Sequence, residues 1–110
     1  MLTSKQRAFL RAAAHDKKPV VLIGHKGVTD AVVQETGAAL LAHELIKVRL
    51  GEGEGVKDEA RALADGAKAE LIAVTGRVAI LFRQHPNADK RKVQLPKAKK
   101  KDLFEVKDDA

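Results

Sequence analysis

The four residues Gly24-His25-Lys26-Gly27 are the stretch of this sequence whose types and spacing best suit chemistry with an anion. Glycine has no Cβ, so the backbone at either end of this stretch can take positive φ or approach a ligand closely. Lys26 adds a positive charge, and His25 can donate a hydrogen bond or stack on a base. If a helix begins just after Gly27, its unpaired N–H groups and its dipole also favour a phosphate here. Such glycine pairs recur in ordinary turns, so the surrounding elements must decide between the two interpretations.

Residues suited to enzyme catalysis are scarce. Ser4 is the only serine and cysteine is absent, which leaves little from which to build an activated nucleophile. His43-Glu44 resembles the opening of a zincin motif, but Lys47 stands where the second histidine is required. The four histidines have no ligand spacing, and His43 is better explained as a complement to a helix C-terminus. The turn is also too short for the GxxxxGK[ST] nucleotide loop. We predict no catalytic residues, no metal site, no cofactor and no enzyme activity.

Composition indicates one small basic domain. A chain of 110 residues with 45% hydrophobic residues can build a modest core. Its net charge of +6 favours a polyanionic partner, most simply nucleic acid. The excess lies mainly in residues 84–101, which hold seven Lys or Arg and one acidic residue, whereas residues 102–110 are acidic. Only three aromatic residues are present, all Phe, which argues against the exposed aromatic sheet of an RRM.

The N-terminal segment and the hydropathy pattern bear on localisation. Lys5, Arg7 and Arg11 interrupt the first residues, unlike a signal peptide, and no apolar run approaches the roughly 20 residues of a transmembrane helix. The absence of cysteine is compatible with a reducing compartment. We expect a cytoplasmic protein that does not bind membranes or a small-molecule substrate and that acts as a monomer.

Local patterns predict seven elements in the order helix, strand, helix, strand, helix, strand, strand. Capping signals such as Thr3 with Gln6, and Thr29 before Asp30, mark helix starts. The apolar run 20–23 is typical of a strand covered on both faces or nearly so, and Gly76 marks a hairpin turn. We expect helices over 3–15, 30–42 and 56–68, and strands over 20–23, 45–50, 71–74 and 78–82.

Two of these elements allow a prediction of which side chains face the core. In the strand 45–50, Ile46, Val48 and Leu50 alternate with Lys47 and Arg49, which places the two cations on one face. The apolar stripe of the helix 30–42 is expected to include the following residues: Ala31, Val32, Ala38, Leu41 and, less clearly, Leu40.

The predicted order favours an α/β fold of α+β-like character. Strands joined through helices favour parallel pairing with right-handed crossovers, and the final hairpin adds an antiparallel strand. We expect a small mixed four-stranded sheet packed with helices. Residues 1–83 are predicted to form this domain. Residues 84–110 are predicted to form an extended or disordered tail, basic and then acidic, because Pro86, Pro96 and the density of Lys and Arg disfavour a compact element.

The ordered chain resembles the CRM domain family, in particular its free-standing bacterial members of the YhbY type. The resemblance rests on blocks that follow one another from residue 2 to about 96 and that are jointly far more specific than the glycine pair. They are Leu2-Thr3-x-Lys5-Gln6-Arg7-x-x-Leu10-Arg11, Lys18-Pro19-Val20-Val21-x-Ile23-Gly24-x-x-Gly27-x-Thr29, His43-Glu44-Leu45-Ile46-Lys47-Val48, Gly76-Arg77-x-x-x-Leu81-Phe82-Arg83 and Lys92-Val93-x-Leu95-Pro96.

The resemblance implies an RNA-binding domain similar in fold to the C-terminal domain of translation initiation factor 3. Bacterial members look like factors associated with precursors of the large ribosomal subunit, and plant relatives act in intron splicing. The family's GxxG loop, a candidate RNA contact, falls on Gly24, His25, Lys26 and Gly27. The sequence departs from the family at Phe82, where Tyr is common, and residues 97–110 extend beyond the similarity.

We therefore expect a non-catalytic RNA-binding protein that binds ribosomal RNA in large-subunit precursors and acts in ribosome assembly. Each cation outside the turn could equally be a solvated side chain. Two alternatives remain open: an adaptor that docks on ribosomal proteins, and a basic protein that binds duplex DNA. The expected RNA contacts are Gly24, His25, Lys26, Gly27, Lys5, Arg11, Lys47, Arg49 and Arg77.

Overall fold

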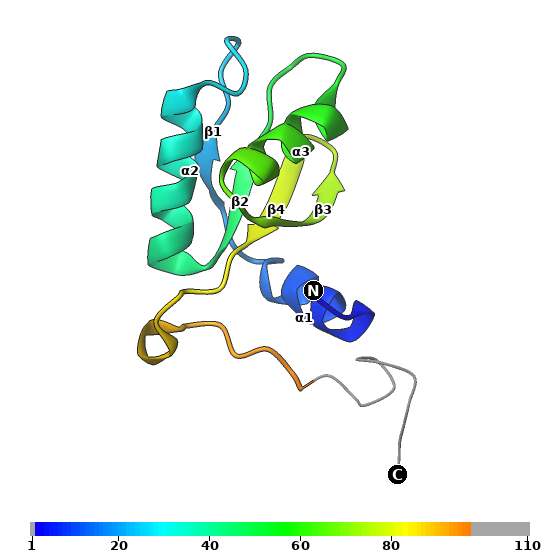
Figure 1. The fold of residues 1–110 in the computed structure, drawn as a ribbon. Coiled ribbons are helices and arrows are strands. Elements are labelled where there is room, and N and C mark those ends of the chain that lie inside the picture. The colour runs from blue at the N-terminus through cyan, green and yellow to red at the C-terminus, as the bar shows by residue number, and fades with distance from the viewer. Residues whose placement is uncertain (1, 98–110) are drawn as a thin grey trace.

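The computed structural model describes residues 2–97, and within them the predicted order of helices and strands is confirmed (Figure 1). A single 3₁₀ turn, η1 (Ala88–Lys90), is added after the last strand. The acidic end and the lysines at positions 99–101 lie outside the described residues. The elements are α1 (Ser4–Ala13), β1 (Pro19–Leu22), α2 (Asp30–His43), β2 (Leu45–Arg49), α3 (Val56–Gly66), β3 (Glu70–Thr75) and β4 (Val78–Phe82).

The four strands form one mixed sheet in the order β1-β2-β4-β3. β1 and β2 pair in parallel, as expected for strands joined through the helix α2, and β4 is antiparallel to both β2 and β3. β1 and β3 are therefore the edge strands. This arrangement confirms the predicted mixed four-stranded sheet.

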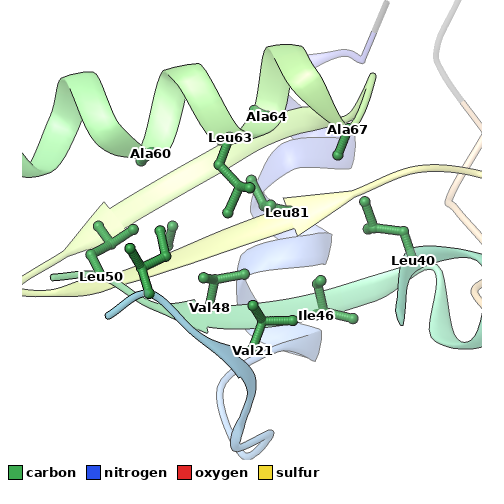
Figure 2. Packing of buried hydrophobic residues seen from close by; sticks show 12 residues of the cluster. Val21, Leu40, Ile46, Val48, Leu50, Ala60, Leu63, Ala64, Ala67 and Leu81 are labelled. Atoms are coloured by element: carbon green, nitrogen blue, oxygen red, sulfur yellow. The ribbon is translucent and has the colours of Figure 1, made fainter. Parts of the chain in front are cut away.

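The larger hydrophobic core lies between the sheet and the helices α2 and α3. Figure 2 shows Leu63 of α3 pointing at Leu81 of β4, and the same cluster includes Leu40 of α2 and Val48 of β2. All four side chains are 0% exposed. Ile46, Val48 and Leu50 all join this cluster, so the predicted alternation along β2 is confirmed and Lys47 and Arg49 point to the opposite face.

The helix α1 covers part of that opposite face. Its Leu10 is fully buried in a second cluster with Leu45, Ile80 and Phe82. The predicted capping box starts this helix, since Gln6 N donates to Thr3 Oγ1 at 3.0 Å and Thr3 N donates to Gln6 Oε1 at 3.1 Å. Figures 1 and 2 show α1 at one end of the sheet, on the side away from α3.

The prediction that the run 20–23 is covered on nearly both faces was wrong. Val21 and Ile23 are buried, but Val20 is 48% exposed and Leu22 is 65% exposed. The reason is that β1 is an edge strand whose second face is not covered by α1. Val20 and Leu22 consequently lie on the open face of the sheet, the same face as the cations of β2.

The expected apolar stripe of α2 was also wrong in part. The fully buried residues are Thr36 and Leu40, whereas Leu41 is 49% exposed and Ala31 and Ala38 are exposed. Apolar residues surround this helix on most sides, so their spacing does not select one face. Packing against α3 and the sheet decides instead which residues of α2 are buried.

Residues 84–97, here called the C-terminal segment, follow β4 and run back along the α1 end of the domain (Figure 1). Val93 and Leu95 pack against the second cluster, and Gln6 Nε2 donates to the Pro96 carbonyl at 3.0 Å. The carboxylate of Glu44 accepts the N–H groups of His85, Lys92 and Val93 at 2.6–2.7 Å. One buried side chain thus fixes two parts of this segment.

Candidate nucleic-acid interface

Gly24 to Gly27 form a tight turn at the end of β1. The Gly27 N–H donates to the Gly24 carbonyl at 3.0 Å, and Gly27 has a φ of 77°. His25 and Lys26 occupy the two central positions, and both are exposed. Among the described residues, the backbone N–H groups of His25 and Lys26 donate to no protein acceptor. The tip of the turn therefore offers two amides and a cation to a ligand.

The helix α2 begins close behind this turn, as predicted. Thr29 is its N-cap, with Thr29 Oγ1 accepting the Val32 N–H at 3.2 Å. Asp30 occupies the first turn of the helix, and its carboxylate already complements the helix dipole. We therefore assign the candidate phosphate seat to the turn itself, with its free amides and Lys26, rather than to the end of the helix.

Arg49 comes close to the turn across the parallel pair of strands. The Ile23 N–H donates to the Arg49 carbonyl at 2.9 Å, and Arg49 stands opposite Leu22 in the register. Gly24, His25 and Arg49 line one cavity of about 510 Å³. Leu22 and the loop after β2 complete its walls. Five of the nine expected contacts, counting Lys26 and Gly27 in the turn, thus lie in one region.

Arg77 and Lys47 make contacts within the fold. Arg77 Nη1 donates to the carbonyls of Gly51 at 2.6 Å and Gly53 at 2.9 Å, so it holds the loop that walls the cavity. Lys47 Nζ donates to the His15 carbonyl at 3.0 Å at the end of α1. These bonds give both cations a role in positioning backbone.

Lys5 and Arg11 are exposed on α1. Arg11 lines a second cavity of about 300 Å³ with Lys47 and Ile80 on the open face of the sheet. Lys5 lines neither this cavity nor the one beside the turn. The nine expected contacts are therefore distributed over two regions, the turn and the α1 side of the sheet.

Two residues beside the turn were not singled out from the sequence. Leu22 was expected to be covered, and its exposure depends on the strand order. Glu59 accepts the Gly51 N–H at 2.8 Å, which fixes the start of the loop between β2 and α3. This bond joins a loop to a side chain eight residues further along the chain, so no local pattern in the sequence indicates it.

The two glycines of the turn should differ in their importance for folding. An alanine at position 27 must take the left-handed φ of 77°, which is expected to lower the free energy of unfolding by about 1–2 kcal/mol. Gly24 has no positive φ, and a Cβ there would meet nothing within 4 Å. We expect Gly24→Ala to leave the stability unchanged. Urea denaturation of the two variants checks this difference, and equal losses would contradict it.

A turn of this form, between a strand and a helix of a mixed α-β-α-β-α-β-β domain, suggests a comparison with known families. The sequence model of the CRS1/YhbY (CRM) domain family matches residues 2–83. The chain belongs to the CRS1/YhbY (CRM) domain family. The match covers every helix and strand of the CRM domain described above, including the turn.

Named relatives of this CRM domain are similar over most of its length. The probable RNA-binding protein YqeI of Bacillus subtilis is 35% identical over 98 residues, which is 87% of this chain and all of YqeI. An RNA-binding protein of Haemophilus influenzae is 35% identical over 87% of this chain and 96% of its own. The solution structure of SAV1595 from Staphylococcus aureus, a hypothetical protein considered a candidate for RNA binding, superposes with a TM-score of 0.72 at 29% identity, covering 87% of this chain and all of SAV1595.

Within residues 2–97, neither a metal-binding cluster nor a membrane-spanning helix is found. The described part of the CRM chain has no cluster of three or more His, Cys, Asp or Glu residues that could hold a metal ion. None of its helices has the length and hydropathy needed to cross a bilayer.

Proposed function

We propose that this CRM protein binds RNA without catalysing a reaction, and that the turn Gly24–Gly27 seats a phosphate of the RNA backbone. The single observation that carries the proposal is the exposed turn itself, with its two free amides beside Lys26. Backbone N–H groups and a lysine are the donors that phosphate binds in many proteins. The RNA-binding names of relatives with full-length similarity support the choice of RNA.

Cations beyond the turn extend the proposed footprint. Arg49 faces the same cavity as His25, and Lys47 and Arg11 line the neighbouring part of the sheet. Lys90, Arg91 and the other basic residues of the C-terminal segment add affinity that depends on salt and not on base sequence. Arg77 contributes mainly through the loop that it holds.

We further propose that the bound RNA is ribosomal RNA in precursors of the large subunit and that the protein acts there as a monomeric cytoplasmic assembly factor. The support for this step is the resemblance to bacterial members of the YhbY type. The two alternatives, docking on ribosomal proteins and binding of duplex DNA, make different predictions. A protein adaptor needs no phosphate seat, and a DNA-binding protein is competed by DNA as effectively as by RNA.

Crosslinking in cells, followed by sequencing of the attached nucleic acid, tests this function. We expect enrichment of large-subunit ribosomal RNA over messenger RNA and DNA. In vitro, unlabelled RNA should displace a labelled ribosomal fragment better than DNA of equal length at fixed salt. Crosslinks confined to proteins favour the adaptor, and equal competition by duplex DNA favours the DNA-binding alternative.

A further inference from the structure

We propose that the cavity beside the turn is a binding site for one unpaired RNA base. The inference rests on the proposed function, since the phosphate of the same nucleotide would lie on the turn. The cavity measures about 510 Å³, within the range of about 300–1,000 Å³ that is usual for small-molecule sites. It lies between the end of β1, the turn, and the loop that follows β2.

One wall of the cavity is apolar. Leu22 is 65% exposed, the largest value among the exposed large hydrophobic residues of the described chain. A base face is apolar, so contact with Leu22 removes hydrocarbon surface from water on both partners. A phosphate gains nothing from such a wall.

Two planar side chains stand on the rim of the same cavity, His25 in the turn and Arg49 at the end of β2. Imidazole rings and guanidinium groups both stack on nucleobases, and unpaired bases in RNA are commonly held in this way. The scarcity of aromatic residues therefore does not exclude stacking in this protein. Here stacking is expected at one cavity, on His25 and Arg49, and not on aromatic residues spread over a sheet.

Charge also distinguishes a base from a second phosphate. Glu52, in the loop after β2, also lines the cavity. A carboxylate repels a phosphate but accepts hydrogen bonds from the amino and imino groups of a base. Lys26 in the turn, and Glu52 together with Arg49 in the cavity, thus suit a nucleotide placed with its phosphate on the turn and its base in the cavity.

The walls are held by bonds within the protein, so the site exists before RNA arrives. Arg77 fixes the carbonyls of Gly51 and Gly53, Glu59 fixes the Gly51 N–H, and the Ile23 N–H is bonded to Arg49. A base that is paired and stacked in a duplex cannot enter without being extruded. The site therefore selects single-stranded RNA, a loop or a bulge.

Leu22→Ser and its control Val20→Ser test the site with the full chain. Both residues are exposed and lie on the same face of β1, but Val20 does not line this cavity. Fluorescence anisotropy would measure the affinity of each protein for a labelled single-stranded RNA of 12 nucleotides and for the same strand in a duplex, at fixed salt. Leu22→Ser removes the apolar wall against which the base face packs, and a tenfold loss of affinity corresponds to about 1.4 kcal/mol. We expect Leu22→Ser to weaken single-strand binding about tenfold, to leave duplex binding unchanged, and Val20→Ser to change neither.

The outcomes separate this inference from the function on which it rests. Single-strand affinity that is the same in Leu22→Ser as in the wild type overturns the base site, as does an equal loss for both RNAs. If Leu22→Ser binds both RNAs as the wild type does, while His25→Asp together with Lys26→Asp weakens the binding of both, the phosphate seat stands and only the base site fails. If the wild-type protein binds neither RNA, both proposals fail.

Discussion

Replacing Glu44 with alanine is expected to lower the free energy of unfolding by about 3 kcal/mol and to release the C-terminal segment from the domain. Glu44 is 1% exposed, and its two carboxylate oxygens accept three backbone N–H groups. Removing the acceptor leaves each of these part-buried donors without a partner, at about 1–3 kcal/mol for each donor that stays buried. Escape of the segment into water limits the total loss.

The measurement is urea denaturation combined with hydrogen exchange at the amides of His85, Lys92 and Val93. We expect these amides to lose protection in Glu44→Ala. Glu35→Ala is a matched control, because Glu35 is an exposed carboxylate on the helix that Glu44 ends. A loss in Glu44→Ala no larger than in Glu35→Ala would contradict the proposed clamp.

The same carboxylate makes stability depend on pH. Burial raises the pKa of Glu44, but three backbone N–H donors and the nearby His85 outweigh it and hold the pKa below its ordinary value. A carboxyl group whose folded pKa is depressed stabilises the fold above its unfolded pKa, about 4.3, and loses this contribution as the pH falls through the folded value. Glu44→Gln should therefore be less stable at neutral pH and should lack this part of the acid-induced loss.

The backbone at Glu44 makes this arrangement hard to foresee. Glu44 ends α2 with a φ of 65°, a conformation in which glycine is usual. From the sequence, His43-Glu44 suggested only a failed metal motif and one block of the family resemblance. The partners of the carboxylate lie 41 to 49 residues away in the chain, so no local pattern indicates them.

Features that depend on a few neighbouring residues could be predicted from the sequence. The capping box at Thr3, the N-cap at Thr29 and the alternation along β2 were each correct, because each is decided within one turn or one strand. The order of elements followed from these local signals. The mixed sheet then followed from general rules for connecting strands.

Features that depend on how distant elements pack could not be predicted. The run 20–23 is as apolar as a central strand, yet the strand order places it at the edge and leaves Leu22 open. The candidate site likewise has one part that is decided by neighbouring residues and one part that depends on distant elements. The turn was recognised from its glycines, whereas the cavity requires the pairing of β1 with β2 and the bonds of Arg77.

Charge reversal in the turn is the second large effect that we expect. His25→Asp together with Lys26→Asp places two carboxylates beside the free amides of the proposed phosphate seat and removes the charge of Lys26, while the turn, held by its own backbone bond, stays intact. Both side chains are exposed, so the fold should persist. Hydrogen bonds to charged groups contribute about 1.5–3 kcal/mol, which corresponds to a loss of roughly tenfold to hundredfold in RNA affinity.

A control must separate the local contact from the change in overall charge. Arg61→Asp with Ala62→Asp changes the net charge by the same amount, since each pair alters one neutral and one positive residue. Both positions are exposed on α3. Long-range repulsion should weaken RNA binding slightly and equally in the two double variants, and it is screened beyond about 10 Å at 0.1 M salt.

The affinity of these two double variants for a large-subunit ribosomal RNA fragment, measured at one moderate salt concentration, is the most direct test of RNA binding through the turn Gly24–Gly27. We predict that the variant with Asp at positions 25 and 26 loses at least tenfold in affinity, whereas the α3 variant stays within about twofold of the wild type. Equal affinity of the turn variant and the wild type would contradict the phosphate seat.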